Sequence, residues 1–214
     1  MTFKTSLVAI FSLTFALTAV AKEKLSSKEV DRVLAKYRQA KAIQAKVKKT
    51  VVQETIGTQM DSQGEFYFSK GKLRMEISEP ERSVLVYDGK NVWFESRLDE
   101  EHVHVTKLRS NELKRSDSLL TALFDRKDVL KNFKLVDTKT TDSKKNFVFE
   151  PKDKKKTEVQ KLEIGLKEGE IPRISYKDQM ENQVTLEFSN LSKDSVSAAK
   201  FAYKPPKGAE VSEF

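Results

Sequence analysis

The feature that most restricts the fold of this 214-residue chain is a repeated alternation of apolar and polar residues in short segments. Residues 64–68 and 73–77 alternate in this way on either side of a turn at 70–72, and Asp88–Asn91 is the strongest turn signal in the chain. Successive side chains of a strand point to opposite faces, so a period of two predicts half-buried strands joined by hairpins. The predicted strands begin at Ile43 and continue over residues 64–68, 73–77, 83–87, 92–95, 102–107, 133–137, 146–150, 159–166, 171–177 and 183–191.

Two segments depart from this period and predict helices. Residues 25–42 carry apolar side chains at helical spacing, and Ser26 and Glu29 have the spacing of a capping box. Residues 110–133 hold leucines and phenylalanines that also suggest helix. Together with about ten strands, these helices predict an α+β fold, in which a large antiparallel sheet curls on itself.

The first 21 residues have the pattern of a signal peptide. Lys4 gives the start a positive charge, residues 7–20 are almost entirely apolar, and Ala19-Val20-Ala21 has the small residues that signal peptidase accepts. This apolar run is shorter than the roughly 20 residues of a membrane span. We therefore expect cleavage after Ala21 and a single exported domain over residues 22–214; the alternative is an uncleaved N-terminal anchor.

Composition narrows what an exported domain of this kind can do. The chain has no cysteine, which excludes a thiol nucleophile, a thiolate metal site and a lipid-modified N-terminal cysteine. Removal of residues 1–21 takes away one lysine and no acid, so 39 basic and 32 acidic residues give a net charge of +7. Export argues against a nucleic-acid partner. The basic excess then serves solubility or the approach to anionic lipid headgroups.

The residues that could carry chemistry are few. His102 and His104 are the only histidines, and in a strand they would share a face, but no third metal ligand accompanies them. The sequence has no Gly-x-Ser-x-Gly nucleophile motif and no phosphate-binding glycine loop. We expect neither a catalytic site, nor a metal, nor a cofactor; an enzyme would have to use one of the two histidines.

The remaining signal is hydrophobic. A curled sheet covered by helices has an inside, which is either filled with side chains or encloses space for a ligand. The pattern alone leaves both possibilities open. The large apolar residues expected on one or both faces of the sheet are Phe66, Phe68, Leu73, Met75, Ile77, Trp93, Phe147 and Phe149.

The order of several motifs resembles the periplasmic outer-membrane lipoprotein carrier family, LolA. The first motif is Gly-Glu-Phe-Tyr-Phe at residues 64–68, and Lys-Gly-Lys-Leu-Arg-Met-Glu follows at 70–76. Leu-Val-Tyr-Asp-Gly-Lys-Asn-Val-Trp-Phe at 85–94 is the most specific single block. The resemblance extends to the tail, where Ala-Ala-Lys-Phe at 198–201 precedes Tyr-x-Pro-Pro-x-Gly-x-x-Val at 203–211.

This resemblance implies an incomplete antiparallel β-barrel of about ten or eleven strands with a helical lid. In the family, a cavity between barrel and lid holds the acyl chains of a lipoprotein, which an inner-membrane ABC transporter supplies and an anchored outer-membrane receptor or its substitute accepts. The implied role is that of a monomeric periplasmic chaperone without enzymatic activity. The absence of a cysteine to be lipidated separates such a mobile carrier from the anchored receptor. The alternative is a lipoprotein-sensing module of an envelope-stress regulator with the same fold.

The resemblance also suggests residues for these roles. Lys70 stands nearest to a family arginine that is important for cargo transfer and transporter contact; lysine keeps the charge but lacks the planar guanidinium. We therefore expect Lys70 to contact the transporter or a lipid headgroup. Where some members have aromatic residues, this chain has Leu73 and the adaptable Met75. The residues expected to line the acyl cavity are Phe66, Phe68, Leu73, Met75, Ile77, Leu85 and Trp93 from the sheet, and Leu120, Leu123 and Phe124 from the lid.

Overall fold

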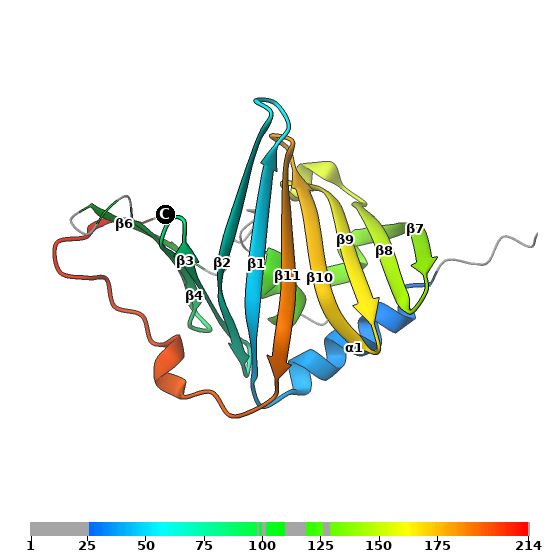
Figure 1. The fold of residues 1–214 in the computed structure, drawn as a ribbon, viewed down its shortest axis with the longest axis horizontal. Coiled ribbons are helices and arrows are strands. Elements are labelled where there is room, and N and C mark those ends of the chain that lie inside the picture. The colour runs from blue at the N-terminus through cyan, green and yellow to red at the C-terminus, as the bar shows by residue number, and fades with distance from the viewer. Residues whose placement is uncertain (1–25, 98, 100–101, 110–118, 126–128, 214) are drawn as a thin grey trace, which may run out of the picture.

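A single twelve-stranded sheet organises the protein (Figure 1). The computed structural model describes residues 26–97, 99, 102–109, 119–125 and 129–213. The strands lie side by side in the order β12-β6-β5-β4-β3-β2-β1-β11-β10-β9-β8-β7, so β12 and β7 are the two edges of an open sheet. The strands are β1 (Ile43–Gln53), β2 (Thr58–Ser69), β3 (Lys72–Glu79), β4 (Ser83–Tyr87), β5 (Asn91–Arg97), β6 (Val103–Arg109), β7 (Phe133–Thr141), β8 (Lys144–Pro151), β9 (Val159–Lys167), β10 (Glu170–Asp178), β11 (Asn182–Ser192) and β12 (Glu210–Glu213).

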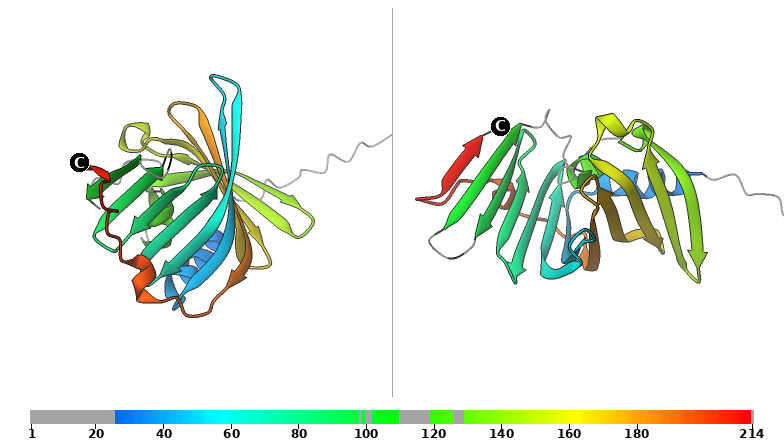
Figure 2. Two further views of the ribbon diagram at one scale, coloured as in Figure 1. Left: turned by 60° about the vertical axis from the view of Figure 1, so that its left-hand side comes forward. Right: turned by 90° about the horizontal axis from the view of Figure 1, so that it is seen from above.

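The sheet curves, and its concave side is covered by helix α1 (Lys28–Gln39) and the shorter helix α2 (Leu119–Asp125), as the two views of Figure 2 show. The C-terminal segment, residues 193–209, runs along the outside of the sheet between β11 and β12. Three short 3-10 turns complete the described elements: Val129–Asn132, Lys154–Lys156 and Ala198–Phe201.

Helix α1 forms as its apolar spacing predicts. Its buried side chains are those that recur at helical spacing: Val30, Val33, Leu34 and Tyr37. The capping box predicted from Ser26 and Glu29 is wrong, because Ser27 occupies the N-cap. The Ser27 hydroxyl donates to Asp31 Oδ2 at 3.0 Å instead, and Glu29 accepts from Lys145 Nζ at 2.8 Å, which ties α1 to β8.

The Asp-Gly-Lys-Asn turn between β4 and β5 is held by the Asp88 carboxylate. Its Oδ1 accepts from the backbone N–H groups of Lys90 and Asn91, each at 2.8 Å. Gly89 has φ +97°, a conformation that favours glycine. Burial raises the pKa of Asp88, but the hydrogen bonds from Asn91 and Lys90 outweigh it, so the pKa lies below its usual value.

Gly64 has a steric role in the Gly-x-Phe segment. The register between β2 and β3 shifts between Gln63 and Gly64, and the two backbones approach closely there. A Cβ on residue 64 would lie 1.9 Å from the carbonyl oxygen of Glu76. Only glycine fits this close approach of β2 to β3 at the register shift.

The predicted fold class is confirmed: the sheet is open, mostly antiparallel and helix-covered. Two details differ from the sequence prediction. The described residues form twelve strands, and the additional strand β12 pairs with β6 in parallel, with Val211 opposite Val105. A four-residue strand gives too short a pattern to be recognised from periodicity. The expected signal segment, 1–21, lies outside the described residues.

Candidate functional site

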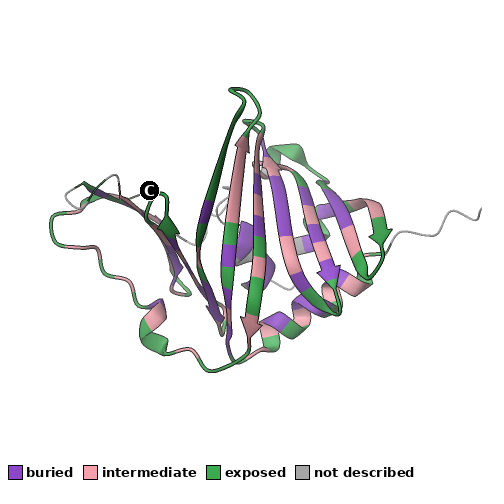
Figure 3. Ribbon diagram, viewed as in Figure 1, coloured by how far each residue is buried: buried purple, intermediate pink, exposed green. Residues whose placement is uncertain are grey.

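The register of β2, β3 and β4 brings the predicted sheet residues onto one face. Phe68 lies opposite Leu73, and Phe66 lies opposite Met75, whose other neighbour is Leu85. Directly opposed residues of antiparallel strands share a face, so these side chains form one continuous surface on the concave side. Burial alternates along β3, whereas residues 66–68 of β2 and 85–87 of β4 are buried at consecutive positions because both faces of these strands are covered. Figure 3 shows the buried positions as bands across the strands. Nine of the ten predicted lining residues belong to a single buried cluster: Phe66, Phe68, Leu73, Met75, Ile77, Leu85, Leu120, Leu123 and Phe124.

Helix α2 closes this cluster with three of its side chains. Leu120, Leu123 and Phe124 are at most 3% exposed. The ring of Phe124 is the centre of the contact, because its centroid lies 5.5 Å from those of both Phe66 and Phe68. Tilted aromatic pairs at this separation contribute about 0.5–1.5 kcal/mol each beyond the area that they bury. The seven-residue helix therefore depends on the sheet for its position.

Two residues of α1 fix the helices on the sheet. The Tyr37 ring lies 5.7 Å from that of Phe124, and its hydroxyl accepts from the backbone N–H of Ile171 at 3.0 Å. Burial raises the pKa of Tyr37 to about 12. Arg38 Nη1 donates to the carbonyl oxygen of Leu123 at 3.2 Å, which supplies a donor near the end of α2. Sequence patterning marked Tyr37 only as a buried helix position.

A small pocket adjoins the cluster beside α2. The void within it is about 30 Å³, space for a few water molecules and far too little for an acyl chain. Its wall is mainly apolar, and it includes one lysine, Lys49 of β1. The residues that line the pocket are Lys49, Met75, Ile77, Ser83, Leu85, Phe94, Leu120, Tyr176, Val184 and Leu186.

Lys49 is a residue that the sequence reasoning missed, although the signal was present. It is in phase with Val47 and Val51 along β1, so the period of two already placed it on the concave face. The run Lys46-Val47-Lys48-Lys49 suggests an exposed surface instead, because clusters of lysines are typical of exposed positions.

Trp93 does not share the concave face, so the expectation that it lines the same surface is corrected. Trp93 lies opposite Val86 and Lys107, whereas its neighbour Phe94 lies opposite Leu85. The indole N–H donates to Asp88 Oδ2 at 3.3 Å, and the ring lies 5.3 Å from that of Tyr203. The one-residue offset follows from the turn at Asp88, and periodicity within a four-residue segment did not resolve it.

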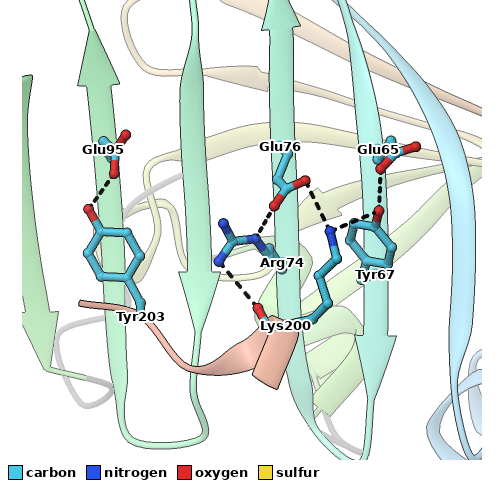
Figure 4. A network of polar contacts seen from close by, with 7 residues as sticks. All are labelled: Glu65, Tyr67, Arg74, Glu76, Glu95, Lys200 and Tyr203. Carbon is cyan, nitrogen blue, oxygen red and sulfur yellow. Dashed lines mark hydrogen bonds and ion pairs between the residues drawn. The ribbon is translucent and has the colours of Figure 1, made fainter. Parts of the chain in front are cut away.

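On the convex face, the C-terminal segment is held by a network of polar contacts (Figure 4). Tyr203 donates to Glu95 Oε2 at 2.6 Å, and Arg74 Nη1 donates to the backbone oxygen of Lys200 at 3.2 Å. Lys200 Nζ also lies 3.2 Å from the Tyr67 hydroxyl oxygen. Burial, followed by the hydrogen bond to the Glu95 carboxylate, raises the pKa of Tyr203 well above its usual value.

Two further carboxylates belong to the same network, Glu76 and Glu65. Arg74 and Lys200 both contact Glu76, and Tyr67 donates to Glu65. The tail motif that includes residues 198–203 thus has a structural role: it anchors the chain across β2–β5 before β12 joins the edge of the sheet.

The other candidate residues are exposed. Lys70 lies in the β2–β3 turn with φ +48° and forms no ion pair with any other described residue. His102 precedes β6, with Nδ1 2.7 Å from Asp99 Oδ2, and His104 Nδ1 lies 3.7 Å from Glu210 Oε2. Within the described part of the chain, no three His, Cys, Asp or Glu side chains are grouped so that they could hold a metal ion. Among the same residues, no helix is long and apolar enough to span a membrane.

The fold and the site define a class of protein: an open, curved sheet whose apolar concave face is covered by helices. The comparison with known families is specific, because residues 38–204 match the family model described as outer membrane lipoprotein carrier protein LolA. The chain belongs to this family. An outer-membrane lipoprotein carrier protein from Ralstonia nicotianae is 30% identical over 152 residues, which is 70% of this chain and 68% of the relative. The protein of the same description from Cupriavidus pinatubonensis is 30% identical over 70% of this chain and 69% of its own length.

A solved structure agrees with the fold. An uncharacterized conserved protein from Thermus thermophilus superposes with a TM-score of 0.52 over 88% of this chain and the whole of that chain, at 13% sequence identity. At this identity the likeness concerns the arrangement of strands and helices alone.

Proposed function

We propose that this protein is a non-enzymatic carrier that binds the acyl chains of a lipoprotein on the concave face of its sheet. In this proposal it works in the periplasm and moves lipoproteins from an inner-membrane transporter to an acceptor at the outer membrane. Membership of the lipoprotein carrier family supports the general role. The observation that carries the proposal to this site is the buried cluster formed between α2 and strands β2–β4.

The chemistry of this cluster suits acyl chains. Each methylene that leaves water contributes about 0.8 kcal/mol, so two or three chains supply a large driving force. The void of about 30 Å³ beside α2 is too small for them. Binding therefore requires α2 to move, so that acyl chains replace the contacts of Leu120 and Phe124 with the sheet. The same exchange permits release. When an acceptor with higher affinity for the acyl chains removes them, α2 can return to its closed position on the sheet.

We further propose that Lys70 contacts the transporter or a lipid headgroup. It is exposed at the tip of the β2–β3 hairpin, and its positive charge is not neutralised by another described residue. The strand that ends at this turn contains Phe66 and Phe68, so a partner at Lys70 lies at the end of the strand that carries the proposed lining.

A transfer experiment tests the carrier proposal. Residues 22–214 are incubated with vesicles that contain the transporter and a labelled lipoprotein, and ATP is added. We expect a soluble complex of protein and lipoprotein; no ATP-dependent release would contradict the proposal. Leu120→Asp places a charge in the lining and should abolish the complex. Ile56→Asp is the matched control, because Ile56 is 67% exposed on the β1–β2 turn.

A further inference from the structure

Lys49 is placed on the concave face by the pairing of its strand. In β1 it lies between Leu186 of β11 and Ser62 of β2, two residues from Val47 and Val51. Alternation therefore directs its side chain toward the helices. The neighbouring Lys48 points to the convex side, where its Nζ lies 3.2 Å from Asp61 Oδ2. The two adjacent lysines consequently occupy opposite faces of one strand.

Among the residues that the structure describes, none forms an ion pair with Lys49. It is half-buried and lines the pocket with Met75, Leu85 and Leu120, which belong to the proposed acyl lining. Ser83 and Tyr176 bring hydroxyl groups to the same wall, but no described carboxylate forms an ion pair with Lys49. An ammonium group in a largely apolar pocket is stabilised when an anion or another oxygen acceptor enters with it.

From this geometry we propose that Lys49 binds the oxygen-bearing head of an acyl ligand whose hydrocarbon chain lies against Met75, Leu85 and Leu120. A carboxylate head is preferred to an ester, because a charge-assisted hydrogen bond is stronger than one to a neutral carbonyl. The inference rests on the proposed function, since it assumes that the concave face accepts acyl chains. It adds an orientation of the ligand in that site: the head lies at Lys49, and the hydrocarbon chain extends from it under α2.

Three probes with the same ten-carbon chain length test this inference. The head group is an anionic carboxylate in decanoate, a neutral ester in methyl decanoate and a cationic ammonium in decyltrimethylammonium. Each is titrated calorimetrically, below its aggregation concentration, into the wild type, Lys49→Met and Lys48→Met. Methionine keeps the length and the apolar stem of lysine, and circular dichroism checks that both variants are folded.

We expect the wild type to prefer decanoate to decyltrimethylammonium. Lys49→Met should weaken decanoate binding about tenfold, the effect of one charge-assisted hydrogen bond, and abolish the preference for the anion. Lys48→Met removes the same charge from the opposite face and should preserve the preference. A parallel loss for methyl decanoate in Lys49→Met supports an ester head as a natural ligand, and a loss confined to decanoate supports a free carboxylate.

Three results would overturn the inference, and they are distinguishable. Binding of all three probes that is the same in the wild type and in Lys49→Met leaves the carrier proposal intact but excludes a role for Lys49 in head recognition. If Lys48→Met loses the preference for the anion to the same extent, the preference comes from the net charge of the protein, and a specific role for Lys49 is excluded as well. Absence of binding for every probe contradicts the acyl-binding face itself, and with it both proposals.

Discussion

The two faces of strands β2–β5 are held in different ways. On the concave face, α2 rests on the sheet through the packing of Phe124 with Phe66 and Phe68, at centroid distances of 5.5 Å. On the convex face, the C-terminal segment is fixed by directed hydrogen bonds, such as that from Tyr203 to Glu95 at 2.6 Å. The same strands thus have one side covered mainly by apolar packing. On the other side, the apolar contact of Tyr203 with Trp93 is accompanied by directed hydrogen bonds.

This difference indicates which cover can be exchanged for a ligand. Apolar contacts are non-directional, so an acyl chain can replace a leucine or a phenylalanine at little cost. A buried carboxylate such as Glu95, which is 4% exposed, needs its particular donors and would be destabilised without them. The concave cover is therefore suited to opening, and the convex cover is suited to holding the sheet in its curved form.

The largest expected effect comes from Phe124→Ala on the concave face. Loss of a fully buried phenylalanine costs about 3–5 kcal/mol of unfolding free energy, because both transfer energy and packing are lost. Urea denaturation measures the loss. If acyl chains can replace the ring, saturating decanoate should restore more stability to this variant than it adds to the wild type. An equal gain in both proteins would contradict the exchange of side chain for ligand.

On the convex face, Tyr203→Phe should have the next largest effect. It keeps the ring that packs on Trp93 but removes the hydroxyl that donates to Glu95, a loss of about 1.5–3 kcal/mol for a bond to a charged group. Decanoate should restore no more stability than it adds to the wild type, since the convex contacts are not the exchangeable ones. If decanoate restored more stability to Tyr203→Phe than it adds to the wild type, the proposed difference between the two faces would be contradicted.

Tyr37→Phe tests the hydrogen bond that anchors α1. At neutral pH the change leaves the Ile171 N–H without its acceptor and should cost about 1–3 kcal/mol. Burial raises the pKa of Tyr37 to about 12 in the folded state, and its value in an unfolded chain is about 10. The native state thus holds this proton more tightly, and the contribution present below pH 10 is lost as pH rises to about 12.

The wild type should therefore lose more stability than Tyr37→Phe over this alkaline range. Urea midpoints compared at pH 9 and pH 11.5 measure the difference. Tyr203 and the other tyrosines titrate in both proteins, so their effect cancels in the comparison. Equal slopes in the two proteins would mean that Tyr37 is more accessible to water than its buried position on α1 indicates.

Lys200→Met should have the smallest effect, although it also touches the convex network. The Lys200 side chain is 40% exposed, and its contact with Glu76 spans 3.5 Å. Exposed ion pairs contribute about 0–1 kcal/mol, and added salt should shrink the difference from the wild type. A loss as large as that of Tyr203→Phe would place Lys200 among the principal anchors of the C-terminal segment.

Sequence patterns predicted most of the fold because each pattern has a local cause. The period of two in residues 64–68 and 73–77 reflects strands with one buried face, and it correctly grouped Phe66 with Met75. The same reasoning failed at Trp93, because a segment of four residues between turns does not define which parity faces inward. Phe94 and Trp93 are both large and apolar, so composition did not decide between them.

By itself, the sequence determined the type and order of most elements, β12 being the exception, since side-chain spacing and turn residues such as Gly89 act within a few residues along the chain. It also determined the family, through motifs whose order extends to residue 211. The tertiary structure alone decided which faces meet: that Lys49 enters the apolar pocket, that Trp93 faces outward, and that residues 198–203 return to bind β2–β5. The physical reason is that register and strand order arise from contacts between residues far apart in the sequence, which no local pattern encodes.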